Sequence, residues 1–187
     1  MRRPSIASAL AEIRALKLTL ARLDPRAGMP VQPPSGASAS GLAVVEQRLG
    51  RPLPPSYREL LSLHDGVPLF YQGASLLGTR PLARGTYVDL CRFVVETRGE
   101  NERDLVPFGI DAEAEVVFAW DLAADAPGGE LEVVVFMNEI GVRLDGFPTF
   151  LEMCIDMLGS DLADLEAALP ASRRRNRSGP GFAIHAA

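Results

Sequence analysis

The stretch LGRPLPPSYRELLSLHDG, residues Leu49–Gly66, contains a sharply marked helix start. Pro54 and Pro55 fit only the first turn of a helix, because proline lacks the N–H group that a later turn requires. An apolar stripe at helical spacing follows, made of Tyr57, Leu60, Leu61 and His64. The stretch therefore predicts a core-facing helix that Gly66 ends.

The ending His64-Asp65-Gly66 raises two hypotheses, an acid–base pair or a helix stop. Adjacent helical residues point about 100° apart and do not face each other. The only other histidine is His185, near the end of the sequence, so a histidine-based metal site would need mostly carboxylates. We interpret His64 as a structural residue in the last helical turn, near the negative end of the helix.

The residues before this helix divide into three segments. An apolar stripe predicts an amphipathic helix in residues 1–24, and its members are Ile6, Leu10, Ile13, Leu16, Leu20 and Leu23. Residues 25–40 are rich in Pro, Gly and Ser and predict a flexible linker. A short helix closed by Gly50 then opens a domain that covers residues 41–170. The stripe of the first helix must dock on this domain, pair with another copy or bind a partner.

The centre of the chain has short runs rich in Val and Phe, which predict strands. They are VPLFY at Val67–Tyr71, LVPFGI at Leu105–Ile110, EVVFAW at Glu115–Trp120 and LEVVVFM at Leu131–Met137. Residues 111–114 and 121–130 carry turn chemistry and predict antiparallel hairpins. Between residues 73 and 100 we expect a strand near Leu76 and a helix or strand over Val88–Val95.

The chain closes with helical spacing and then with a polar segment. Phe147 to Leu158 predicts one helix, a second shorter helix follows Gly159, and Pro170 stops it. Residues 171–187 predict an Arg-rich, disordered tail. The expected fold class is α+β: a single domain with a central antiparallel sheet flanked by N- and C-terminal helices.

Charge and composition narrow the function. The 187 residues include 24 acidic and 19 basic residues, a formal net charge of −5, which disfavours direct binding to nucleic acid or anionic membranes. Two cysteines far apart in sequence predict reduced, partly buried thiols. Without a bilayer-length apolar run, we expect a cytoplasmic protein. No sequence motif indicates a cofactor, a metal or a catalytic site, so we expect a protein that is not an enzyme.

Six acidic residues cluster around the first well-defined strand: Glu100, Glu102, Asp104, Asp111, Glu113 and Glu115. Converging carboxylates could hold a divalent cation or do hydrolytic work, but carboxylates spread over loops are more often a solvated face. We retain the hypothesis that they form an acidic surface for a cationic partner. The arginine cluster Arg173–Arg175 and Arg177 lacks the aromatic platform of nucleic-acid sites.

Three motifs in order resemble the SUKH superfamily, the Smi/Knr-like proteins. They are LAVVEQRLGRPLPPSYRELLSLHDG, then LVPFGIDAEAEVVFAWD, then GFPTFLEMCIDML, and the resemblance extends over roughly residues 40–159. The matching positions are Glu46, Leu53, Pro54, Tyr57, Leu60, Gly66, Pro107, Phe108, Gly109, Asp111, Trp120, Asp121, Phe147, Phe150 and Leu151. The turn His64–Val67 and the stretch DAEAE depart from the family pattern, which leaves any functional subgroup open.

This resemblance implies a non-enzymatic binding domain, in bacteria an immunity protein that neutralises a cognate toxin by occlusion. Such toxins include nucleases, whose clefts are basic because they hold phosphate. The expected partner is a basic protein toxin. The alternative is a regulatory or scaffold module that recruits other proteins and uses the N-terminal helix for self-association. The sequence does not determine the oligomeric state.

Overall fold

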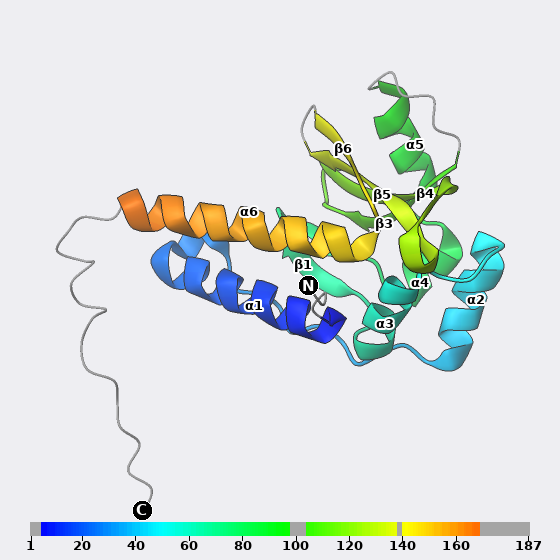
Figure 1. Cartoon of the computed structure of the whole chain (residues 1–187), viewed down its shortest axis with the longest axis horizontal. Coiled ribbons are helices and arrows are strands. Elements are labelled where there is room, and N and C mark those ends of the chain that lie inside the picture. Colours follow the sequence, from blue (N-terminus) through cyan, green and yellow to red (C-terminus); the bar gives the residue numbers. More distant parts are fainter. Residues whose placement is uncertain (1–4, 98–103, 138–139, 169–187) are drawn as a thin grey trace, which may run out of the picture.

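The computed structural model describes residues 5–97, 104–137 and 140–168 (Figure 1). Its helices are α1 (Ile6–Leu23), α2 (Ala39–Leu49), α3 (Pro55–Leu63), α4 (Thr79–Arg84), α5 (Val88–Thr97) and α6 (Phe147–Ala168), with short 3-10 turns η1 (Pro25–Ala27) and η2 (Pro127–Gly129). Its strands are β1 (Val67–Tyr71), β2 (Ala74–Leu76), β3 (Leu105–Ile110), β4 (Val116–Ala126), β5 (Glu130–Met137) and β6 (Ile140–Leu144).

The six strands form one sheet in the order of the sequence, each antiparallel to the next. This meander with helices before, between and after its strands confirms the predicted α+β class. Four consecutive residues of β5, Val133–Phe136, are buried. Since successive side chains of a strand point to opposite faces, both faces of the sheet centre are covered.

The predicted strands and the hairpin predicted at residues 121–130 are present, but the turn is shorter than predicted. Strand β4 continues to Ala126, and only Pro127–Gly129 turn the chain. Asp121 accepts a hydrogen bond from the Ala123 N–H at 2.9 Å, and the pairing with β5 shifts register between Asp121 and Asp125. The strand therefore has a bulge between Asp121 and Asp125 and continues beyond it.

Two other elements were not predicted from the sequence, α4 and β6. Strand β6 contains Gly141 and Arg143, and it forms because β5 offers it a full ladder from Val133↔Leu144 to Met137↔Ile140. The segment Val88–Val95, which the sequence predicted to be either a helix or a strand, belongs to helix α5.

The predicted break at Gly159 is also wrong, because α6 runs without interruption to Ala168. A single glycine costs a helix only about 1 kcal/mol relative to alanine. Leu162 and Leu165 continue the apolar stripe of the helix beyond Leu158 and pack against the core. That burial offsets the cost of Gly159.

The core is centred on aromatic side chains that sequence separation would not place together. The Tyr57 ring packs edge-on against Phe108, Trp120 and Phe147, with centroids 5.3, 4.8 and 5.0 Å away. The Tyr57 hydroxyl lies 2.8 Å from the Leu77 carbonyl and 3.0 Å from the Phe108 carbonyl. Tyr57 thus joins α3, β3 and the start of α6 in one cluster.

The start of α3 is stabilised from the sheet. The helix begins after Pro54, which offers no side-chain cap. Glu130 of β5, only 6% exposed, accepts hydrogen bonds from the Ser56 N–H at 2.9 Å and the Ser56 hydroxyl at 2.7 Å. A carboxylate at a helix N-terminus supplies both a hydrogen-bond acceptor and a favourable charge.

Helix α1 docks on its own domain, the first of the three alternatives left open by the sequence. Figure 1 shows α1 and α6 side by side and running in the same direction. Ile6, Ala9, Ile13 and Leu20 of α1 are buried there. Half of the six stripe residues, Ile6, Ile13 and Leu20, are therefore buried within the chain, and the other three are partly buried.

The C-terminal end of the segment predicted as a linker is hydrogen-bonded to the end of α3 and to the turn after it. The Ala37 N–H donates to the Leu61 carbonyl at 2.7 Å, and the Asp65 N–H donates to the Ser35 carbonyl at 3.0 Å. The division of the chain at residues 24, 40 and 170 stays a prediction, and the predicted tail lies outside the described residues.

Both thiols are free and buried, as predicted for Cys91 and Cys154. Burial raises the pKa of the Cys91 thiol to about 11 and that of Cys154 further still. Because of this burial, both thiols are protonated at neutral pH and unreactive.

Candidate protein-binding surfaces

The turn His64-Asp65-Gly66 joins α3 to β1. Helix α3 ends at Leu63, one residue earlier than predicted, and His64 has an extended backbone. Its ring turns away from the helix toward the preceding segment, with Nδ1 3.1 Å from the Pro34 carbonyl. The prediction that His64 lies in the last helical turn is therefore corrected: it caps that turn.

Asp65 is held by the start of α4. Its Oδ1 accepts a hydrogen bond from the Thr79 N–H at 2.5 Å, and its Oδ2 accepts one from the Thr79 hydroxyl at 3.0 Å. Gly66 has a φ of +94°, and a Cβ there would lie 2.8 Å from the Gly78 nitrogen. These contacts give Asp65 and Gly66 structural roles in the turn.

The six acidic candidates do not form one cluster. Glu100 and Glu102 lie outside the described residues, and exposed Asp104 precedes β3. Asp111 follows the other end of β3. Six residues of strand span roughly 20 Å, so Asp104 and Asp111 are far apart.

Asp111, Glu113 and Glu115 share the turn between β3 and β4, which we call the acidic hairpin. Asp111 has a structural role there, since its Oδ1 accepts a hydrogen bond from the Val116 N–H at 3.1 Å. Glu113 and Glu115 are exposed. Within the part of the chain that the structure describes, neither forms an ion pair, so their charge is available to a partner.

Other carboxylates of the sheet form ion pairs within the chain. Arg143 of β6 lies 3.0 Å from Asp121 of β4 and also pairs with Glu132 of β5. Burial, followed by the charges of Asp121 and Asp145, raises the pKa of Glu132. Across residues 5–97, 104–137 and 140–168, no three His, Cys, Asp or Glu side chains are placed to hold a metal ion.

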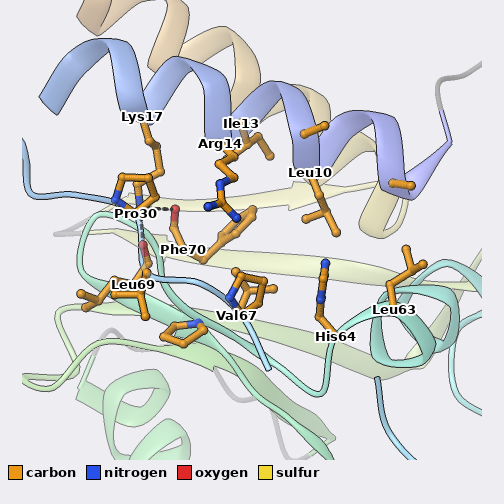
Figure 2. Close-up of a pocket in the computed structure, with 15 residues that line it drawn as sticks. Leu10, Ile13, Arg14, Lys17, Pro30, Leu63, His64, Val67, Leu69 and Phe70 are labelled. Atoms are coloured by element: carbon orange, nitrogen blue, oxygen red, sulfur yellow. Dashed lines mark hydrogen bonds between the residues drawn. The ribbon is translucent and has the colours of Figure 1, made fainter. Parts of the chain in front are cut away.

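A second surface, which the sequence did not indicate, lies between α1 and the edge strand β1. It is a pocket of about 260 Å³ whose walls are α1, residues 30–33 and residues 63–70 (Figure 2). A further pocket of about 420 Å³ shares Lys17 and Leu69 with it and continues to Arg26 and Met29. We call the two together the α1–β1 groove.

Exposed apolar side chains are concentrated around this groove. Six large hydrophobic residues are exposed in the described part of the chain, and four of them line it: Met29, Val31, Leu63 and Leu69. Val44 and Leu90 lie elsewhere. Met29 and Val31 fall in the predicted linker, so apolar residues within a Pro-rich segment were the signal available in the sequence.

Basic side chains complete the groove. Figure 2 shows Arg14 and Lys17 reaching from α1 toward β1. Lys17 Nζ donates hydrogen bonds to the carbonyls of Leu69 and, at 3.0 Å, Phe70. Burial lowers the pKa of Lys17. Arg14 Nη1 donates to Gln32 Oε1 at 2.5 Å, which ties α1 to the far wall.

The family comparison covers the acidic hairpin and the β1 side of the α1–β1 groove. Residues 36–153 match the SMI1 / KNR4 family (SUKH-1). The chain belongs to this family. The resemblance drawn from three motifs is thereby confirmed, and no curated protein matches the chain.

SUKH-1 proteins are generally non-enzymatic, protein-binding domains. Helix α1 and residues 24–35 lie outside the matched range, so one wall of the α1–β1 groove is an addition to the family domain. None of the helices in the described residues is long and apolar enough to cross a membrane.

Proposed function

We propose that this SUKH-1 protein is an immunity protein that binds a cognate bacterial toxin in the cytoplasm and blocks its active site. The observation that carries the proposal is the family match over residues 36–153, because the family provides protein-binding domains of the immunity type. Binding requires an accessible surface that the fold does not use for itself.

The acidic hairpin is the surface that we assign to the toxin. Glu113 and Glu115 are exposed on a turn whose backbone is fixed by Asp111. An acidic surface on a chain of net charge −5 accelerates encounter with a basic cleft, by a factor of about 10 to 10³ in favourable cases. Occlusion of a nuclease cleft would follow from the same complementarity.

The scaffold alternative loses its proposed assembly element. It assigned self-association to the apolar stripe of the N-terminal helix, and Ile6, Ile13 and Leu20 of that stripe are buried inside the chain.

The test begins with capture of bound proteins by the full chain from its native lysate at low and high salt. The captured protein is then expressed alone and together with the full chain. We expect a basic protein that stops growth when expressed alone, a rescue by the full chain, and binding that weakens as salt rises.

The acidic hairpin is tested in the same system with Glu113→Lys and Glu115→Lys combined. Asp111 is left unchanged because it supports the turn. The matched control reverses two exposed carboxylates on helices, Glu59→Lys with Asp156→Lys, and changes net charge equally. Association should slow about tenfold or more in the hairpin variant and much less in the control. Equal rates in both variants would remove the hairpin from the interface, and a captured protein without toxicity would overturn the proposed function.

A further inference from the structure

We propose that the α1–β1 groove binds a short peptide segment of a partner protein, one that carries large apolar side chains flanked by Asp or Glu. This goes beyond the proposed function, since a basic toxin would meet the acidic hairpin. It adds a second binding surface of opposite charge to the same chain.

The apolar part of the proposal rests on where side chains are left exposed. Leu69 is 48% exposed and Met29 65% exposed, beside a hollow that is lined on its other side by Leu10 and Ile13 of α1. Burying apolar surface contributes about 25 cal/mol per Å². A concave apolar site ringed by exposed apolar residues is the usual form of a peptide anchor site.

The charge of the groove selects the partner. Arg14, Lys17 and Arg26 line it, whereas Asp161 is the single carboxylate among the lining residues. Carboxylates beside the apolar anchors would therefore be favoured, and cationic peptides repelled. The chain's own residues 169–187 contain four arginines and no acidic residue, so they have the wrong charge to occupy the groove.

The backbone of β1 is distorted in a way that presents Leu69 to the groove. Leu69 has a φ of +45°, which is costly for a leucine. Its N–H donates to Ser75 Oγ at 3.0 Å, and its carbonyl accepts from Lys17. Backbone strain that the surrounding hydrogen bonds maintain is typical of functional positions.

The same contacts define how a peptide would be recognised. Because Lys17 already donates to the carbonyls of Leu69 and Phe70, a partner strand that paired with β1 at these residues would compete with Lys17. Recognition would depend on side chains that enter the pocket and on carboxylates that reach Arg14 and Arg26.

The experiment selects random peptides displayed on phage against the immobilised full chain. We expect the enriched peptides to combine large apolar residues with Asp or Glu. A synthetic copy of the most enriched peptide is then titrated with the full chain in solution. Lys17 is the only lysine in the sequence, so lysine-specific isotope labelling gives one side-chain NMR signal inside the groove. That signal should shift as the peptide binds.

Two variants with matched controls test the location. Leu69→Asn removes the apolar side chain and suits the positive φ, and Arg14→Glu reverses a charge on the exposed side of α1. Each should weaken the peptide at least about tenfold. Val44→Asn, at a site 51% exposed on α2, and Arg22→Glu, outside the groove on α1, should leave affinity unchanged.

Thermal unfolding is measured for all four variants. Unchanged midpoint temperatures show that a loss of affinity does not come from a loss of folding. Enrichment of basic or purely polar peptides would overturn the proposal. So would a lysine signal that stays fixed, equal losses in the variants and their controls, or tight binding of a synthetic peptide of residues 169–187.

Discussion

Tyr57 and Lys17 both donate hydrogen bonds to backbone carbonyls far along the chain, in very different surroundings. The Tyr57 hydroxyl reaches Leu77 and Phe108 from a fully buried position within a shell of aromatic rings. Lys17 reaches Leu69 and Phe70 from a half-buried position at the rim of a groove. The first contact belongs to the matched family domain and the second to the layer that α1 adds.

The contrast separates stability from recognition. Around Tyr57 every neighbouring aromatic side chain is buried, so a lost group leaves a void that cannot readily close. Around Lys17 apolar side chains remain exposed and the pocket is open. Neighbouring side chains or water can therefore fill the space that a removed group leaves there. Substitutions in the centre should therefore destabilise the whole domain, and those in the added layer should act more weakly and locally.

The largest effect is expected from Phe108→Ala in the centre. The Phe108 ring stacks on Trp120 at 4.8 Å and contacts Phe118, Phe147 and Phe150. The free energy of unfolding should fall by about 3–5 kcal/mol. Denaturant unfolding followed by the fluorescence of Trp120, the single tryptophan, measures it. Val44→Ala on the surface is the control and should stay within about 0.5 kcal/mol. A loss below about 1 kcal/mol for Phe108→Ala would contradict the central role of the cluster.

An intermediate effect is expected from Ile13→Ala in the added layer. Ile13 is buried but also lines the α1–β1 groove. The loss should lie near the lower end of the range for such substitutions, about 2 kcal/mol, because the open groove limits the void. Hydrogen exchange should show faster opening of α1 than of β4. Glu12→Ala, exposed on the same helix, is the control, and equal exchange rates in α1 and β4 would mean that the two layers unfold together.

The smallest effect is expected from Lys17→Met, which keeps the aliphatic chain and removes the two donated hydrogen bonds. We expect a loss of about 1 kcal/mol or less near neutral pH, because the cost of burying the ammonium group offsets the hydrogen bonds. Burial lowers the pKa of Lys17 from its ordinary value of 10.5.

The lowered pKa also predicts a pH dependence. Between that pKa and 10.5 the unfolded chain binds more protons than the folded chain, so the contribution of Lys17 to stability rises with pH. The difference in unfolding free energy between the parent and Lys17→Met should therefore increase through this window. The single lysine signal gives the pKa directly by NMR titration, and a value at or above 10.5 would contradict the burial of this group.

Much of the fold could be predicted from short-range patterns. The two prolines before Tyr57 marked the start of α3, the stripe from Ile6 to Leu23 located α1 within the predicted residues 1–24, and Val- and Phe-rich runs located most strands. In each case, residues within a few positions of one another carry the signal, because helical and strand periodicity are local properties.

The errors occur where a distant element decides the outcome. Strand β6 needs the ladder of β5, α6 passes Gly159 because its stripe remains covered, and β4 continues past Asp121 because β5 stays paired to it. Of the four acidic candidates within the described residues, the structure brings Asp111, Glu113 and Glu115 into one turn and leaves Asp104 at the other end of β3. Nearness in sequence did not predict nearness in space, because a strand separates Asp104 from Asp111.

The sequence by itself determined the α+β class, the family and the presence of an amphipathic helix before the family domain. Only the tertiary structure decided the α1–β1 groove. Its walls come from residues more than 50 positions apart, such as Lys17 and Phe70. Such a contact depends on how an amphipathic helix settles against a sheet edge, and local periodicity contains no information about that choice.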